Sequence, residues 1–277
     1  MKIVSTGSAL NSREFYEKKK KRRRLELILL AIASVLILVG LIYFSRQEKF
    51  LVTDVVILGE NVVDKDQMTQ AVEESLAGYY LWLVPRKSTL LYPRRTIEES
   101  LVGNFPRLKS VDLNLEDNEL LIAVEDRTPY ALYCPNISLP ASAGDCFFLD
   151  EDGLIFAIAP SFTGAVYFIY TTEEPIENPI GKKILATEGF KSIKEFIETL
   201  VGLSIYPVAL EISSDEYSLS LANHARIIWR RESDFITIRS NLEAFLSNDT
   251  IRAQSNFLDK ILHLDLRTEN KVFYKFK

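Results

Sequence analysis

The sequence predicts an α+β protein with three parts: an N-terminal transmembrane helix, a small domain of strands and helices, and a β-rich domain with a mainly antiparallel sheet and flanking helices. Three observations support this fold class. An uncharged apolar segment lies near the start of the 277-residue chain. Helix-like and strand-like patterns then alternate up to about residue 127, and short strands separated by turns predominate after it. The composition, 47% hydrophobic and 26% charged, is that of a folded protein.

The net charge of −5 conceals an uneven distribution. Residues 1–26 hold nine Lys or Arg and three Glu, so the remaining residues hold 24 basic and 35 acidic groups. Because an acidic main body repels phosphate, we expect no nucleic-acid partner. With two His and two Cys in the chain, we expect no metal site and no cofactor.

A transmembrane helix is predicted at 27–45. The eighteen residues Leu27–Phe44 carry no charge and would span about 27 Å as a helix, close to the thickness of the hydrocarbon core of a bilayer. A core helix of this length would have a polar face. A cleaved signal peptide would have a shorter apolar region followed by small residues, whereas Ser45–Glu48 follow here. We therefore expect an uncleaved anchor in contact with the lipid bilayer.

The basic run before this segment predicts its orientation. Lys18–Arg24 are seven consecutive basic residues, and positive charge favours the cytoplasmic side of a membrane. Residues 1–26 are therefore predicted to form a cytoplasmic tail, and the C-terminus to lie outside the cytoplasm. Residues 1–17 show no apolar periodicity and predict a flexible segment.

The small domain is predicted at 50–127 with the order strand, helix, helix, strand, strand. Asp64 stands at a helix N-cap, with Gln67 three residues later as a capping-box partner. Its two helices would pack on one face of the sheet. The expected elements are a strand at Phe50–Leu58, a helix with the apolar stripe Met68, Ala71, Val72 and Leu76, a helix from Pro93 to Gly103, and a hairpin of Leu108–Leu115 and Glu119–Arg127.

The β-rich domain is predicted at 128–277. Asp150–Gly153 lacks the spaced ligands of a calcium loop and predicts a hairpin turn with a left-handed Gly. The other expected elements are a helix at Thr187–Val201, strands at Val208–Ser213 and at Tyr217–Trp229 (broken near Asn223 and His224), a partial helix in Leu242–Phe257, and closing strands at Leu262–Arg267 and Lys271–Phe276, joined by a turn at Asn270.

The two cysteines, Cys134 and Cys146, both fall in the part expected outside the cytoplasm. An oxidising compartment favours a disulfide between them, which would contribute about 3 kcal/mol by closing a short loop. The alternative is a pair of buried thiols that pack as small apolar groups.

Motifs that carry catalysis are missing from the sequence. It contains no G-x-S-x-G, H-E-x-x-H, P-loop or dinucleotide-binding pattern, and its two His have no partner at ligand spacing. We therefore expect no enzyme activity and no catalytic residues, with a membrane-anchored envelope enzyme as an alternative.

Several segments, in order, resemble the FtsQ/DivIB family of bacterial cell-division proteins. These proteins have one transmembrane helix, a POTRA domain with the strand-helix-helix-strand-strand order, and a β domain. The matching segments are Val56–Val63, Phe105–Pro106 with Val111–Leu115, Val124–Pro129 (with Asp126 where Glu is usual), Phe147–Phe156 and Leu264–Arg267.

The resemblance implies a non-enzymatic scaffold of the divisome in the inner (cytoplasmic) membrane, at the septum. Its implied partners outside the cytoplasm are FtsB/DivIC-like and FtsL-like coiled-coil proteins, with other divisome proteins at the POTRA domain. A terminal sheet edge can accept a partner strand, and alternating Lys residues make one face of the last strand basic. Lysines on an edge strand also protect against aggregation, which is the alternative explanation. The predicted partner-binding residues are Asp265, Leu266, Arg267, Lys271, Val272, Phe273 and Tyr274.

A further alternative is a POTRA-type envelope chaperone or adaptor, which would hold extended chains at a strand edge near Leu120–Val124.

In the scaffold hypothesis, Arg267 pairs with a partner carboxylate.

Overall fold

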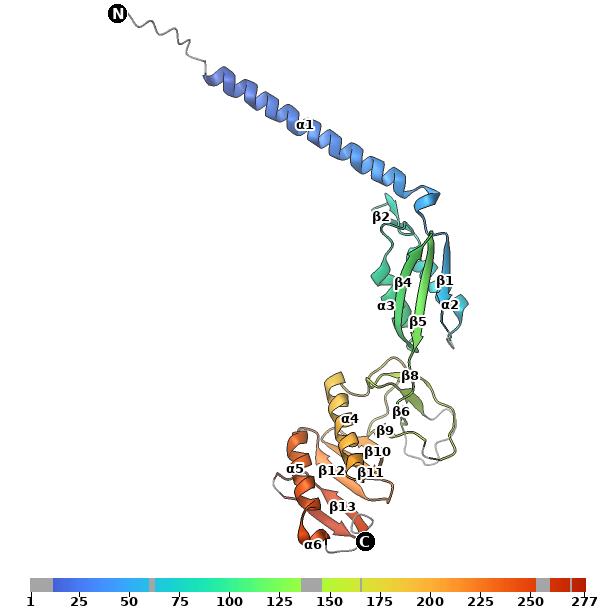
Figure 1. Ribbon diagram of the computed structural model, residues 1–277, viewed down its shortest axis with the longest axis vertical. Coiled ribbons are helices and arrows are strands. Elements are labelled where there is room, and N and C mark those ends of the chain that lie inside the picture. Colours follow the sequence, from blue (N-terminus) through green and yellow to red (C-terminus); the bar gives the residue numbers. More distant parts are fainter. Residues whose placement is uncertain (1–11, 60–62, 136–145, 165, 253–259, 270) are drawn as a thin grey trace, which may run out of the picture. The chain divides into compact units, whose positions relative to one another are not determined.

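Figure 1 shows the computed structural model of the chain, which describes residues 12–59, 63–135, 146–164, 166–252, 260–269 and 271–277. The protein is a mixed α+β structure, in which one long apolar helix near the N-terminus precedes a remainder rich in sheet. The chain divides into two compact units. The first contains the long helix and most of a three-stranded sheet, and the second contains a nine-stranded sheet.

The N-terminal helix, α1 (Ser12–Ser45), begins earlier than predicted. It includes the basic run, so residues 12–17 are helical and not the flexible segment expected; residues 1–11 lie outside the described residues. Lys, Arg and Glu are good helix formers, which explains the extension. Within the part of the chain described, Tyr16–Ser45 is the one helix long and apolar enough to cross a membrane, and its apolar stretch is not buried by the protein.

The next elements are η1 (Glu48–Phe50), β1 (Asp54–Leu58) and α2 (Lys65–Leu76). The strand therefore starts at Asp54, four residues after the predicted start at Phe50, because Phe50 belongs to a short 3-10 turn. Asp64 caps α2 as predicted, accepting the N–H of Asp66 at 2.9 Å. Gln67 donates to the other Asp64 carboxylate oxygen at 3.4 Å. The buried side chains of the helix are Met68, Val72 and Leu76.

Between the two predicted helices lies a hairpin that the sequence analysis missed. It consists of β2 (Tyr79–Tyr80) and β3 (Val84–Pro85), which pair antiparallel. The following helix, α3 (Arg94–Asn104), starts where Pro93 predicts and buries Ile97 and Leu101.

The three-stranded sheet has the order β1-β5-β4. The strands β4 (Leu108–Glu116) and β5 (Glu119–Asp126) match the predicted hairpin. Asp117 and Asn118 at its turn both have positive φ angles, which suits a two-residue hairpin loop. Since β1 pairs parallel with β5, the central strand is β5.

The second unit is built on a nine-stranded sheet of order β14-β13-β12-β11-β10-β9-β6-β7-β8. Five of its strand pairs are antiparallel and three are parallel, so the sheet is mainly antiparallel. The strands are β6 (Ala131–Tyr133), β7 (Phe147–Leu149), β8 (Ile155–Ile158), β9 (Ile169–Thr172), β10 (Pro207–Ile212), β11 (Glu216–Leu221), β12 (Arg226–Arg230), β13 (Ile261–Asp265) and β14 (Phe273–Phe276).

Helices cover one face of this sheet. They are α4 (Thr187–Gly202), α5 (Phe235–Leu246) and the short α6 (Asp249–Arg252). Phe196 of α4 packs edge-on against Trp229 of β12 with ring centroids 5.2 Å apart, and Phe235 of α5 lies against the same ring systems. Trp229 and Phe190 are fully buried in the main core.

In this unit the predicted break within one strand was confirmed, and the predicted start of one helix was wrong. The strand expected at Tyr217–Trp229 is two strands, because His224 has a φ of 68° and turns the chain back at the predicted break. The helix expected within Leu242–Phe257 begins at Phe235, where Asp234 accepts the N–H of Ile236 as an N-cap. Residues 253–259 and Asn270 lie outside the described residues.

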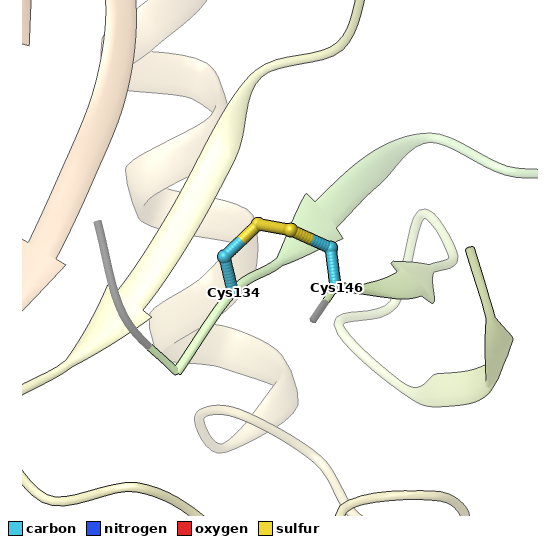
Figure 2. Close-up of a disulfide and its surroundings, with 2 residues drawn as sticks. All are labelled: Cys134 and Cys146. Atoms are coloured by element: carbon cyan, nitrogen blue, oxygen red, sulfur yellow. A yellow bond between two sulfur atoms is a disulfide. The ribbon is translucent and has the colours of Figure 1, made fainter. Parts of the chain in front are cut away.

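The other face of the sheet carries a second, smaller core near β6. Cys134, just after β6, forms a disulfide with Cys146, just before β7 (Figure 2). Both cysteines are buried in this core beside Leu132 and Ile169. The sequence left open a disulfide or two thiols, and the structure contains the disulfide; residues 136–145 between the cysteines lie outside the described residues.

Asp150 forms the hairpin turn predicted in place of a calcium loop. One of its oxygens accepts the N–H groups of Asp152 and Leu154 at 2.9 and 2.8 Å, and Gly153 has a φ of 76°. Its other oxygen accepts a buried charged hydrogen bond from Arg127, whose Nε donates to the carbonyl of Pro106. This turn is therefore held by an ion pair inside the second unit.

Candidate partner-binding edge

The strand β14 lies at one edge of the nine-stranded sheet. It pairs antiparallel with β13, with His263 opposite Lys275 and Asp265 opposite Phe273. On its other side, no strand of the described residues pairs with it. An unpaired edge exposes backbone donors and acceptors that a strand of another chain can satisfy.

The backbone groups that face this edge can be assigned. The N–H of Lys277 donates to the carbonyl of Lys260 at 2.8 Å, so it faces β13. Backbone direction alternates along a strand, so the N–H groups of Tyr274 and Phe276 face the open side. A partner strand would therefore bond to these two residues.

The side chains of β14 alternate between two environments. Tyr274 packs on the helical side, with its ring centroid 5.2 Å from that of Phe245 in α5 and 5.2 Å from that of Phe276. Val272 and Phe276 also pack against the main core. These contacts fix the strand from one face, and the side chains on the opposite face are exposed.

The opposite face of β14 is basic and partly apolar. Phe273 is 55% exposed, and Lys275 and Lys277 are exposed beside it. Lys277 Nζ donates to the carbonyl of Asn223 at 3.0 Å, while Lys275 lies opposite His263. This face can attract an acidic segment that also carries an apolar side chain.

Arg267, just after β13, is held by two carboxylates of its own chain. Its Nη2 lies 2.6 Å from Asp265 Oδ2, and its Nη1 lies 3.0 Å from Glu216 Oε2. Because Glu216 is in β11, the guanidinium connects β11 to β13 across β12. Arg267 therefore braces the end of the sheet at which the chain turns into β14.

The same ion pairs set the charge state of this cluster. The hydrogen bond from Arg267 lowers the pKa of the Asp265 carboxyl, and the two carboxylates raise the pKa of Arg267. Asp265 is consequently ionised at neutral pH. The guanidinium side chain is still 42% exposed, so it has open surface beside its two internal partners.

Two hollows lie beside β13, and neither is lined by a residue of β14. The larger is a shallow polar groove of about 850 Å³ near Arg267, and its charged lining residues are Asp215, Glu216, Arg230, Arg231, Glu232, Asp265 and Arg267. Its mixed charges do not select a strongly acidic or basic ligand. The smaller, of about 120 Å³, is apolar and is lined in part by Ile205, Leu221 and Ile261. A hollow of this kind suits one small apolar side chain of a partner.

The predicted binding residues thus have different positions. Lys271, Phe273 and Tyr274 are exposed, and Val272 is half-buried. Leu266 is 3% exposed, so it supports the hairpin from the core and does not lie on the surface. Sequence reasoning missed Glu216 and Lys277, because the contacts of both residues join segments more than fifty positions apart.

The alternative edge near Leu120–Val124 is not free. These residues belong to β5, which lies between β1 and β4. Strand addition at that position was therefore a wrong expectation. The two edges of the small sheet are instead β1 and β4.

The described residues contain no group of three or more His, Cys, Asp or Glu side chains placed to hold a metal ion. No protein family and no curated protein matches the sequence.

Proposed function

We propose that this chain is a membrane-anchored scaffold of the FtsQ/DivIB type, which binds partner proteins outside the cytoplasm by strand addition at β14. The observation that carries the proposal is the open edge of β14, with the backbone of Tyr274 and Phe276 available and a basic face beside it. Strand addition obtains affinity from backbone pairing and specificity from alternating side chains.

The first unit supports assignment to a POTRA domain. Its elements run strand, helix, helix, strand, strand, with the β2–β3 hairpin added between the helices. Two segments of the family resemblance also meet through a specific contact. Arg127 comes from Val124–Pro129 and Asp150 from Phe147–Phe156, and the two side chains form a buried ion pair. Such a contact gives both segments a structural reason to occur together.

The anchor and the compartment are part of the proposal. In it, α1 spans the cytoplasmic membrane, with Lys18–Arg24 on the cytoplasmic side. The disulfide between Cys134 and Cys146 is consistent with an oxidising compartment outside the cytoplasm. The scaffold acts at the division septum and performs no catalysis.

The chemistry of the edge describes the partner. An extended segment with acidic residues at alternate positions would place them opposite Lys275 and Lys277, and an apolar residue against Phe273. Membrane-proximal segments of FtsB/DivIC-like and FtsL-like proteins are the proposed source. Other division proteins are proposed to bind the first unit.

Co-purification from the native membrane tests this function. The intact chain is compared with a chain that ends after Thr268, which lacks β14 but keeps the buried Leu264 and Leu266 of the core. We expect two small single-span coiled-coil proteins with the intact chain and neither with the shortened one. Near-ultraviolet circular dichroism of both chains verifies that the second unit is folded.

The other outcomes separate the parts of the proposal. Recovery of the same proteins with the shortened, folded chain would contradict binding at β14 and leave the scaffold role in place. If the intact chain recovers no division protein, the scaffold role itself is wrong.

A further inference from the structure

The hairpin β2–β3 presents large apolar side chains to solvent. Its turn residues, Leu81 and Trp82, are 83% and 89% exposed, and Leu83 after them is 45% exposed. Both turn residues have positive φ angles, of 47° and 61°, a conformation that favours Gly and Asn. Because these two bulky apolar side chains are exposed, they do not contribute to the hydrophobic core of the unit. Another role must account for their position at the tip of the turn.

The hairpin is tied to the end of the apolar helix. Arg46, the residue directly after α1, donates from Nε to the carbonyl of Leu83 at 3.0 Å and from Nη2 to the carbonyl of Trp82 at 3.2 Å. Its guanidinium also lies 6.0 Å from the ring centroid of Tyr79. The tip is therefore held at the level at which α1 ends, within the same unit (Figure 1).

This level coincides with a group of aromatic residues. Tyr43 and Phe44 occupy the last turn of α1, and Phe50 lies edge-on against Phe44 with ring centroids 6.4 Å apart. In a helix that spans a bilayer, aromatic residues gather at the membrane–water interface. Trp82 adds a further, almost fully exposed aromatic side chain near the end of α1.

The charge around the hairpin points to lipid. Residues 77–95 contain four basic residues, four aromatic residues and no Asp or Glu, in a chain that is otherwise acidic after residue 26. Arg86 lies 5.6 Å from the ring centroid of Tyr80, so basic and aromatic groups are interleaved. Basic side chains beside an inserted apolar tip bind the phosphates of a bilayer surface.

We propose that the tip of the β2–β3 hairpin, Leu81-Trp82-Leu83, inserts into the outer interface of the bilayer that α1 crosses. The hairpin then acts as a second membrane contact, and Arg46 couples it to the anchor. This inference rests on the proposed membrane span. Two contacts restrain the tilt of the first unit relative to the membrane, whereas a single helix followed by a linker would leave it free to rotate.

The test uses the full chain reconstituted in vesicles of anionic phospholipid, with and without bromine on the upper acyl carbons. Wild type is compared with Trp82→Phe. The chain has two Trp, and Trp229 is fully buried in the second unit, so the difference between the two proteins reports on Trp82. This comparison leaves the core unchanged.

We expect brominated lipid to quench most of the Trp82 emission, and aqueous acrylamide to quench little of it. The emission of Trp82→Phe should respond weakly to both quenchers. If Trp82 is quenched by acrylamide and not by brominated lipid, the hairpin points into water and the proposal is wrong. A tip of that kind would instead be a surface for a protein.

Flotation of the same vesicles through a density gradient at high pH separates this failure from failure of the anchor. A chain that floats but shows a water-exposed Trp82 contradicts the hairpin contact alone. A chain that does not float contradicts the membrane span, and the hairpin contact falls with it.

Discussion

The two edges of the nine-stranded sheet, β8 and β14, differ in their backbone hydrogen bonding to the rest of the chain. At β8, residues 181–182 of the same chain pair with the start of the strand: Ile155 donates its N–H to the carbonyl of Lys182, and Gly181 donates its N–H to the carbonyl of Ile155. At β14, no described segment does the same. The chain covers the start of one edge with its own backbone, while no described strand pairs with the other edge, to which the proposed function assigns partner binding.

The flanking structure follows the same division. Beside the closed edge lie the disulfide, a second core and the buried ion pair of Arg127 and Asp150. Beside the open edge lie exposed Lys275 and Phe273 and a partly exposed ion-pair cluster. Changes at the closed end should therefore alter stability, and changes at the open edge should alter binding.

The largest effect on stability is expected from the disulfide. A Cys134→Ala, Cys146→Ala double variant should lose about 3 kcal/mol of unfolding free energy, because an unfolded chain without the cross-link gains loop entropy. Denaturant unfolding with and without reductant measures this loss. The comparison of the two ends fails if the variant is equally stable but no longer binds its partners under native conditions.

A somewhat smaller effect is expected from Gly153→Ala in the turn before β8. Gly153 has a φ of 76°, and a Cβ there would lie 2.8 Å from the ring of Phe190 in α4. The strained backbone and the overpacking should together cost about 2 kcal/mol, measured by denaturant unfolding. The matched control is Gly189→Ala, where a Cβ meets no atom within 4 Å and stability should change little.

At the open end, Arg267→Met should lower stability at neutral pH by about 1 kcal/mol or less, because its ion pairs are partly exposed. Since Arg267 lowers the pKa of Asp265, the stabilisation is present above the unfolded carboxyl pKa and is lost as pH falls through the folded one. Wild type and variant should therefore converge in stability in acid, as measured by unfolding at pH 7 and near pH 2. A difference that persists in acid would assign the effect to packing.

The smallest effect on stability is expected from Lys275→Glu, within about 0.5 kcal/mol, because the side chain is exposed. Partner association should nevertheless slow, and its dependence on salt should weaken, because the charge attracts an acidic segment. Stopped-flow association at two salt concentrations measures both. An unchanged salt dependence would remove Lys275 from the binding face, and the matched control is Lys191→Glu on the exposed surface of α4.

The sequence predicted those elements whose signals are local. The cap at Asp64 with the stripe of Met68 and Val72, and the turn at Asp117-Asn118, each depend on a few neighbouring residues. The hairpin at Leu81-Trp82 was missed because its turn lacks the Asn or Gly that usually marks one. The start of α5 was missed because the residues after Asp234 are aromatic or β-branched and favour a strand.

In the candidate site, too, the sequence predicted only the features that depend on neighbouring residues. The alternation of Lys and apolar residues predicted an edge strand at the end of the chain, which β14 is. The contact of Arg267 with Glu216, in contrast, joins residues brought together only by the order β11-β12-β13 of the sheet. A single sequence carries no signal for a pairing between residues so far apart, so the internal partner of Arg267 could not be predicted.

The central claim, strand addition at β14, is tested most directly by comparing Tyr274→Pro with Tyr274→Ala. Both variants remove the ring that packs on Phe245, but only proline removes the backbone N–H that faces the open edge. Binding of the partner recovered by co-purification is measured on each full-length variant by titration calorimetry. We predict that Tyr274→Ala retains binding and Tyr274→Pro loses it, with equal unfolding free energies. Equal binding by the two folded variants would contradict strand addition.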